Sequence, residues 1–517
     1  MKTNWKAFIC ALLCLAVMLT PVGCKKSGKT SSTDTQSDME YGDPAKCTLC
    51  PDKNRCCFCY EYGDCVCASG TNTDNSNASG GGETSNGSKN SGTSGKRRPS
   101  QESSSSKYDS KNLKGKTITI LRSWDPYVSG NNTAHDNWIK RVVELEKKYN
   151  FDIVEKKWSS TLETEVLAGV KPSGQLYQVQ GDNVANLVRA GYIASLNKAM
   201  KETGIDMTSE IYCDFSVQLC NYNHNQYAIG VEEGKMMSQI VYNKKLVSQF
   251  ADIEALMDQG KWTWSAMTDI ATKVKQKYPD KWGIGLDKHL SVYGMVASNG
   301  SQLVSVGSDG SLSSNLNDTK VRQALDQLYS WINVDKVATT GSWDNMLTEL
   351  TKSNIAFTFN EDYCYDVLKS RMNADEYGIA YLPMGPSAKE YYALMEASWP
   401  YVVPKAYENE AADLLFVVNE LYKLQPGYSK DDQFRDLYVR KFSEQKSYNR
   451  VKNMHRTLKC APIIEIELGD NASFANAITQ LYENKISVGQ LIDSYHSEFD
   501  MHMKDNWKNI KFTGKIK

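Results

Sequence analysis

The stretch Gln226–Leu246 reads QYAIGVEEGKMMSQIVYNKKL, and it decides the fold of this 517-residue chain. Its two β-rich runs, Gln226–Val231 and Ser238–Asn243, flank a Glu-Glu-Gly turn, and a helix pattern follows the second run. That second run is apolar and β-branched, which is typical of a buried strand. Strand and helix patterns alternate on both sides of the stretch. We therefore expect the chain to leave one α/β lobe here and enter another, with Glu232 and Glu233 at the edge of the cleft between them.

The segment before this stretch predicts an alternation of strands and helices, which favours a parallel, doubly wound sheet. Ligands of such sheets bind beyond the carboxyl ends of the strands. Trp124, Asp125 and Tyr127 follow the first predicted strand, and Asp182 follows the third. The predicted elements are Lys116–Arg122, Asn137–Asn150, Phe151–Lys157, Leu162–Val170 and Leu176–Gln180.

The segment after the stretch repeats the same pattern. Thr263 and Asp318 are placed to cap amphipathic helices, and Trp262 and Trp264 are expected to serve packing. Ser398–Pro404 is interpreted as a return to the first lobe. The chain is thus predicted to be α/β, with two doubly wound lobes joined by hinge crossovers. Further predicted elements are the strands Trp282–Leu286, Ile355–Phe359 and Tyr377–Pro383 and the helices Trp343–Lys352, Tyr363–Arg371, Glu410–Leu424, Phe474–Tyr482 and Val488–Trp507.

Length and composition bound the class of protein. A chain of 517 residues exceeds the roughly 250–300 residues at which one hydrophobic core stops growing. The 60 basic and 61 acidic residues leave a net charge of −1, which gives no case for a nucleic-acid partner. The sequence has no G-x-S-x-G nucleophile turn, no phosphate-binding loop and no metalloprotease H-E-x-x-H spacing. We expect no enzyme activity, no metal in the lobes and no cofactor.

The N-terminus has the pattern of an export signal. Lys2 and Lys6 precede the short apolar run Ala7–Leu19, which is too short for a spanning helix, and Gly23 precedes Cys24. Gly-Cys resembles a bacterial lipobox, although Pro21 stands where an aliphatic residue is usual. We expect lipidation of Cys24 and anchoring at the extracellular face of the cell membrane; a plain secretory signal is the alternative.

Two unusual segments follow the signal. Residues 25–68 carry seven cysteines between Cys47 and Cys67. Disulfide packing is favoured in an oxidising compartment, and a thiolate metal site is the alternative. Residues 69–112 are rich in Ser, Gly and Asn and are predicted to be a disordered linker. Whether Cys213 and Cys220 pair is left open.

The chain from about Leu113 onward resembles the extracellular solute-binding lipoproteins of carbohydrate-type ABC importers, the maltose-binding-protein-like group. The resemblance rests on Gly23-Cys24, the stretch above, Gly260–Trp264 with its helix, Ile355–Phe359 with the following Asn-Glu, and Trp399–Pro404. Ser353-Asn354 departs from a Gly common in the family, which affects only a turn. The resemblance implies a monomeric two-lobed clamp of the type II periplasmic-binding-protein fold, which closes on a small solute and docks on an ABC permease. The expected lobes are 113–230 with 402–455 and 231–401 with 456–517.

The resemblance also implies the ligand-binding residues, each with a structural alternative. Trp124 and Trp399 would stack on sugar rings, although Trp124 could simply fill the edge of its lobe. Asp182 could cap a helix, Glu232 and Glu233 could form a solvated turn, and Trp343 could belong to the core. The set expected to bind ligand is Trp124, Asp125, Tyr127, Asp182, Glu232, Glu233, Trp343, Asn360, Glu361 and Trp399. A polysaccharide-acting surface enzyme and a binder of another solute, such as a peptide, are the alternative functions.

Overall fold

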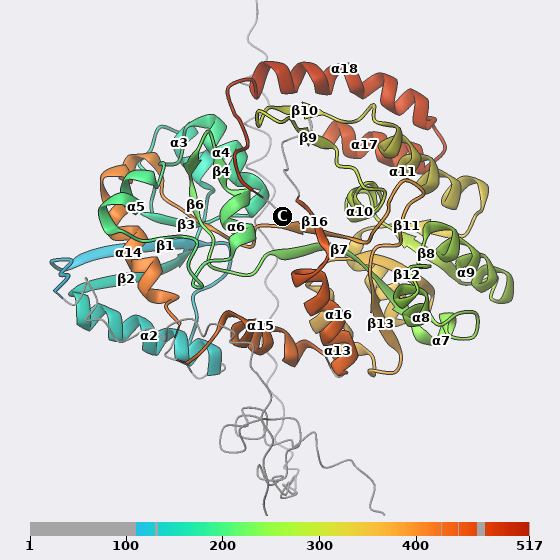
Figure 1. The fold of residues 1–517 in the computed structure, drawn as a ribbon, viewed down its shortest axis with the longest axis horizontal. Coiled ribbons are helices and arrows are strands. Elements are labelled where there is room, and N and C mark those ends of the chain that lie inside the picture. The colour runs from blue at the N-terminus through green and yellow to red at the C-terminus, as the bar shows by residue number, and fades with distance from the viewer. Residues whose placement is uncertain (1–109, 130–132, 425–426, 443, 463–470, 516–517) are drawn as a thin grey trace, which may run out of the picture. The chain divides into compact units, whose positions relative to one another are not determined.

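A computed structural model describes residues 110–129, 133–424, 427–442, 444–462 and 471–515 (Figure 1). The expected signal, lipidation site and cysteine cluster lie outside these residues, as does the expected linker up to residue 109. The last residues of the expected linker, 110–112, are described, and Lys111 among them pairs with Asp413 at 2.7 Å. Within the described part, no helix combines the length and the apolar character needed to cross a bilayer.

The first lobe is built on a five-stranded sheet. Its first three strands run parallel, and the short strand β15 pairs antiparallel with both β3 and β6. The predicted first strand, KTITILR, is β1, and its alternating side chains point to opposite faces of the sheet. The strand order is β2 (Phe151–Lys157), β1 (Lys116–Arg122), β3 (Leu176–Gln178), β15 (Tyr401–Val402) and β6 (Ala228–Ile229).

Helices cover both faces of this sheet. Ile120 and Leu176 belong to the core on one face, whereas their neighbours Leu121 and Tyr177 belong to the core on the other. Helix α14 (Ala411–Leu421) lies on the first face and contacts α5 and α2, as predicted for a helix that returns to the first lobe. The other helices are α2 (Thr133–Tyr149), α3 (Leu162–Leu167), α4 (Val184–Ala190), α5 (Asn197–Thr203) and α6 (Asp214–Leu219).

The second lobe is built on a seven-stranded sheet around β7 (Lys235–Asn243). Strand β7 begins three residues earlier than the predicted run, and Asn243 caps the following helix α7 (Lys244–Val247). It pairs antiparallel with β12, β13 and β14, so those three strands run in one direction. The other strands are β8 (Trp282–Leu286), β11 (Ala338–Thr340), β12 (Ile355–Asn360), β13 (Tyr377–Ala380), β14 (Tyr392–Glu396) and β16 (Lys459–Pro462).

The helices of the second lobe follow the predicted caps. Thr263 caps α9 (Trp264–Lys277) and Asp318 caps α11 (Thr319–Tyr329), while Trp262 and Trp264 are buried as expected. Helix α16 packs on β13 and β14, although the sequence analysis places residues up to 455 with the first lobe. Further helices are α8 (Ile253–Asp258), α10 (Leu290–Ser298), α12 (Trp343–Thr351), α13 (Cys364–Arg371), α15 (Lys430–Tyr438), α16 (Gln445–Arg456), α17 (Asn471–Tyr482) and α18 (Val488–Asn506).

The C-terminal segment that follows α18 joins two hairpins of different lobes. Lys511 bridges to Ser311, directly before β10 (Leu312–Ser314), and Phe512 bridges to Tyr222 in β4 (Asn221–Tyr222). Phe512 also packs its ring against that of Tyr222, with centroids 5.7 Å apart. The lobes are therefore connected by this segment as well as by the two strand crossovers.

Candidate functional site

Glu232 and Glu233 lie between β6 and β7, where the chain crosses from one lobe to the other. The two neighbouring carboxylates contact different elements. Glu232 faces the carboxyl ends of the first-lobe strands, and Glu233 faces α16. The crossover thus has two faces of different chemistry, which we call the front face (Glu232) and the rear face (Glu233).

On the front face, Glu232 accepts long hydrogen bonds from two side chains. Gln178 Nε2 lies 3.3 Å from Oε1, and Ser398 Oγ lies 3.4 Å from Oε2. Burial raises the pKa of Glu232 to about 7, and the charge of Arg122 with these two hydrogen bonds only partly opposes the increase. Near neutral pH this carboxyl can therefore donate as well as accept a hydrogen bond.

Two half-buried tryptophans meet beside Glu232. The rings of Trp124 and Trp399 are 5.2 Å apart in an edge-to-face arrangement, and the carbonyl of Trp399 accepts a hydrogen bond from Gln178. Trp399 has a φ of +33° and directly precedes a proline, a backbone state that non-glycine residues rarely adopt. Such strain persists only where the surroundings enforce it and is frequent at ligand sites.

A glycine makes this close arrangement possible. A Cβ atom on Gly181 would lie 2.0 Å from the carbonyl oxygen of Ala397, so the loop after β3 touches the return crossover. Asp182, the predicted ligand residue of this loop, belongs to the 3-10 turn η3 (Gly181–Asn183). Its backbone is therefore close to the segment that carries Trp399.

Arg122, at the end of β1, organises the aromatic side of the front face. Its side chain is 1% exposed and forms a 2.7 Å ion pair with Glu155. Its Cζ atom lies 5.3–5.6 Å from the ring centroids of Trp124, Tyr127 and Trp138. The predicted residues Trp124 and Tyr127 thus belong to one cluster built on a buried cation.

The second lobe adds charged residues at the edge of its sheet where β7 begins and the antiparallel strands β12 and β14 end. Lys235 pairs with Glu361 at 2.6 Å and with Glu396 at 3.5 Å. Burial alone would lower the pKa of Lys235, but the two carboxylates outweigh it and raise this pKa. Asn360, at the end of β12, is fully buried, and both polar atoms of its amide are without a hydrogen-bond partner in the described structure.

Two predicted residues lie apart from these clusters. Asp125 is mostly exposed and makes a 3.4 Å pair with exposed Lys157. Trp343 begins α12 and packs its ring edge against exposed Tyr363, with centroids 5.6 Å apart. No contact in the described part of the chain joins either residue to Glu232 or Trp399.

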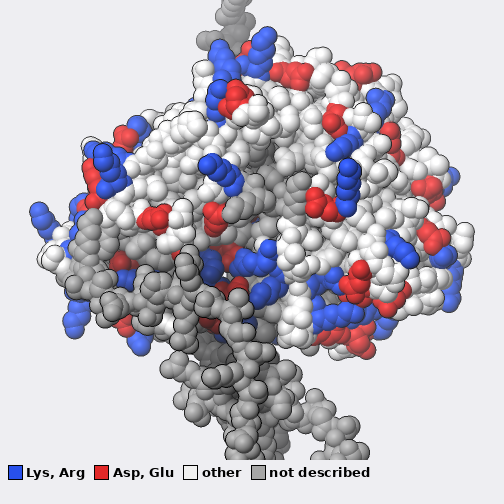
Figure 2. Space-filling model, viewed as in Figure 1, with Lys and Arg blue, Asp and Glu red and all other residues white. Residues whose placement is uncertain are grey.

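On the rear face, Arg456 of α16 donates two hydrogen bonds of 2.8 and 2.9 Å to the carboxylate of Glu233. Burial alone would raise the pKa of Glu233, but these bonds and the charge of Arg456 leave it lowered. The pair borders a cavity of about 380 Å³ that α6, Met395 and Lys430 also line. Figure 2 shows charged side chains around a hollow near the middle of the molecule.

The body cysteines whose side chains are described are not paired. Cys213, at the rear cavity, and Cys220 are buried free thiols, as is Cys364. Burial raises the pKa of each thiol. In the described residues, no group of three acidic, histidine or cysteine side chains is arranged to hold a metal.

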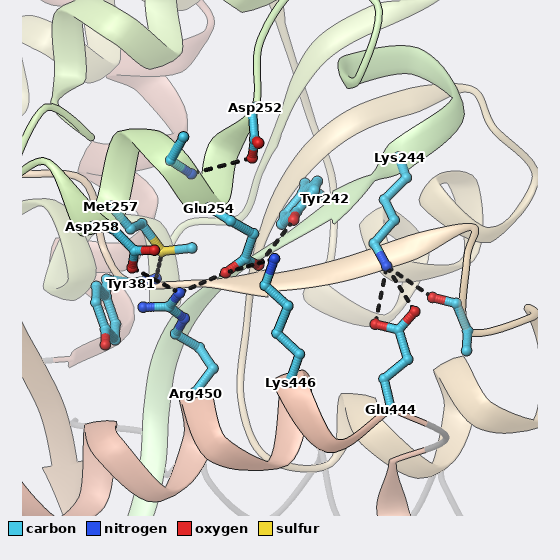
Figure 3. Close-up of polar contacts among 12 residues, drawn as sticks. Tyr242, Lys244, Asp252, Glu254, Met257, Asp258, Tyr381, Glu444, Lys446 and Arg450 are labelled. Atoms are coloured by element: carbon cyan, nitrogen blue, oxygen red, sulfur yellow. Dashed lines mark hydrogen bonds and ion pairs between the residues drawn. The ribbon is translucent and has the colours of Figure 1, made fainter. Parts of the chain in front are cut away.

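A second buried arginine lies between α8 and α16 of the second lobe (Figure 3). Arg450 pairs with Glu254 at 2.5 Å and lies 4.6 Å above the ring of Tyr381. A lysine, Lys446, also approaches Glu254, at 3.7 Å. This cluster resembles that of Arg122 in composition, but its aromatic partner belongs to the second lobe.

The profile of the bacterial extracellular solute-binding protein family matches residues 129–418, which include both crossovers and most of both sheets. The chain belongs to this family. No curated protein sequence matches it.

Solved structures place this solute-binding protein among known folds. An ABC substrate-binding protein of Listeria monocytogenes in complex with cycloalternan has a TM-score of 0.56 at 13% identity, over 75% of this chain and 99% of that one. The GacH receptor of Streptomyces glaucescens, solved unliganded and with acarbose, has a TM-score of 0.55 at 14% identity, over 76% and 99%. Maltose-bound MalE3 of T. maritima has a TM-score of 0.52 at 14% identity, over 74% and 99%. The predicted two-lobed α/β fold is therefore confirmed.

Several residues of the front face were missed from sequence. Arg122, Gln178 and Lys235 lie on strands and Ser398 lies on the return crossover, and each differs in type from the aromatic and acidic loop residues that were singled out. For Arg122 a signal existed, because a charged residue ends an otherwise apolar β-branched run directly before Trp124.

Proposed function

We propose that this protein captures a sugar or oligosaccharide at the front face of the crossover and delivers it, chemically unchanged, to an ABC permease. The observation that carries the proposal is the cluster of Trp124 and Trp399 with Glu232 and Gln178. Aromatic faces stack on the apolar faces of sugars, and carboxylate and amide groups satisfy hydroxyls at fixed positions. The structural neighbours solved with cycloalternan, acarbose and maltose support a carbohydrate as the solute.

Capture couples to lobe movement. A sugar that contacts both Trp124 in the first lobe and the Lys235 cluster in the second would stabilise the closed state by its additional contacts there. The two strand crossovers would bend, and the permease would recognise the closed form. We further propose that the protein is a monomer tethered by lipid on Cys24 at the extracellular face of the membrane.

Fluorescence titration tests the substrate class. Intrinsic tryptophan emission of the purified protein is followed during addition of maltose, cycloalternan, acarbose and tagatose, and we expect a saturable change with at least one. A response to peptides with none to any sugar would overturn the carbohydrate assignment. The sugars are then recovered and analysed, because an enzyme acting on polysaccharide would return products and a binder returns them intact.

Membrane attachment is tested separately. In bacteria that express the full chain, the wild-type protein should fractionate with membranes, and Cys24→Ala should be released or left unprocessed. Equal membrane association of both proteins would contradict the lipid anchor without bearing on sugar binding.

A further inference from the structure

Arg122 is buried among groups that the proposed function uses. Its guanidinium has one carboxylate partner, Glu155, which also accepts a 3.0 Å hydrogen bond from Trp138 Nε1. Its Nε atom is buried and has no hydrogen-bond partner among the described residues. With 1% of the side chain exposed, the guanidinium does not reach a solute in this state.

The arrangement of the rings around this cation suggests what it does. Trp124 and Tyr127 are half-buried, so part of each ring is open while the guanidinium lies within 5.4 Å of both centroids. Planar, delocalised Arg favours such faces, and a desolvated cation–π contact is stronger than an exposed one. Removing the cation would release the rings rather than remove a solute contact.

Arg122 also acts on Glu232 through its charge, which lowers the pKa of that carboxyl against the effect of burial. The other groups facing Glu232 come from several elements. Gln178 lies on β3, Ser398 on the return crossover and Lys430 at the start of α15. The hydroxyls of Tyr127, Tyr401 and Tyr422 lie near enough to interact with it as well.

We propose that Arg122 is the positioning residue of the sugar site, which holds the rings of Trp124 and Tyr127 in their binding orientation. The proposal rests on the proposed function for its ligand. It assigns Arg122 no contact with the sugar.

Arg450 supplies a matched control. It too is a largely buried arginine with a glutamate partner, a ring within 6 Å and a buried Nε without a partner in the described structure. Its partners Glu254, Asp258 and Tyr381 belong to the second lobe (Figure 3). Arg450→Met should therefore reproduce the general cost of removing a buried arginine without disturbing the front face.

The experiment compares wild type, Arg122→Met, Arg122→Lys and Arg450→Met in the full chain. Affinity for maltose and cycloalternan is measured by tryptophan fluorescence, and emission without sugar is followed between pH 5 and 9. We expect Arg122→Met to weaken sugar binding about tenfold or more and to move the midpoint of the pH transition upward. Arg450→Met should lower the melting temperature but leave affinity within twofold and the midpoint unchanged.

Arg122→Lys separates the charge of Arg122 from its planar shape and replaces Arg122→Met if that variant does not fold. It keeps the charge, so the pH midpoint should stay near wild type, while the loss of the planar group should still weaken sugar binding several-fold. Unchanged affinity and midpoint in Arg122→Met, or equal weakening in Arg450→Met, would overturn the proposal. If the wild type binds none of the four sugars of the panel, the proposed function fails, and the sugar-free tryptophan emission of Arg122→Met against that of Arg450→Met alone decides whether Arg122 holds the rings.

Discussion

The front and rear faces of the crossover begin from the same residue type and end in opposite electrostatic states. Among the described residues, the hydrogen bonds of Glu232 are the long ones from Gln178 and Ser398, and burial raises its pKa to about 7. Glu233 accepts a 2.8 Å hydrogen bond from Arg456, and the pKa of Glu233 is lowered. The carboxyl of Glu232 can therefore still bind a solute, whereas the carboxylate of Glu233 connects the crossover to α16.

This difference assigns Glu232 to ligand binding and Glu233 to the stability of the fold. A buried carboxyl without a strong partner costs stability and is characteristic of functional sites. A buried carboxylate with a two-pronged arginine is satisfied and holds segments together. Substitutions on one face should therefore leave the other face unchanged.

Glu232→Gln should have the largest effect on stability, and the effect depends on pH. The folded protein keeps a proton on Glu232 up to about pH 7, whereas the unfolded chain releases it near the ordinary value of 4.5. Stability therefore falls as pH rises between these values, by up to about 3 kcal/mol. The variant should lack this fall and exceed wild type at pH 8, as measured by urea unfolding at pH 5 and pH 8. A wild-type advantage at pH 8 would contradict the front-face assignment.

Trp399→Ala should produce the largest loss of sugar binding. Truncating a central aromatic contact typically costs at least about 2 kcal/mol, or about thirtyfold in affinity. Calorimetric titration with the best sugar of the panel measures the loss. Trp282→Ala is the control, because the ring of Trp282 at the start of β8 faces Lys275 at 3.7 Å. Similar losses in both variants would remove Trp399 from the site.

Glu233→Gln should lower stability without changing sugar affinity. Arg456 is one-third exposed, so the loss should be about 1–2 kcal/mol rather than the larger value of a fully buried pair. Because the pKa of Glu233 is lowered, its contribution is present above about pH 4.5 and is lost as pH falls below it. Urea unfolding at pH 7 and pH 4 should show the two proteins converging in acid. A tenfold loss of sugar affinity would instead place Glu233 at the binding site.

Asp125→Asn should have the smallest effect and tests the weakest part of the front face. Asp125 and Lys157 are both largely exposed, so the unfolding free energy should change by less than about 0.5 kcal/mol. If Asp125 accepts a sugar hydroxyl in the closed state, affinity should fall by about threefold, measured by fluorescence titration. Lys157→Met is the control, and equal affinities in the two variants and wild type would exclude Asp125 from the site.

Much of the fold was predictable because its signals are local. Strands show in the sequence as β-branched apolar runs, as in KTITILR and in the stretch around β7. Helix starts show as capping residues, as at Thr263 and Asp318. The placement of α16 was less accessible. Its apolar face indicates that it packs, but only its contacts with β13 and β14 show where.

The candidate site was predictable in part. Aromatic and acidic residues after strands pointed to Trp124, Tyr127, Glu232 and Trp399, which the structure gathers around Arg122. The different contacts of Glu232 and Glu233 were not assigned, because both fitted the same turn. Gln178 and Ser398 become functional candidates only because β3 and the return crossover meet beside Glu232.

The sequence by itself determined that this chain alternates strands and helices, crosses between lobes at Gln226–Leu246 and carries rings and carboxyls at strand ends. These properties depend on residues near one another in the chain, whose periods and caps act locally. The tertiary structure alone decided that Arg122 lies beneath the rings, that Arg456 neutralises Glu233 and that Glu232 has long hydrogen bonds from Gln178 and Ser398. Arg456 and Glu233 lie 223 positions apart in the chain, and no local pattern contains the information that pairs them.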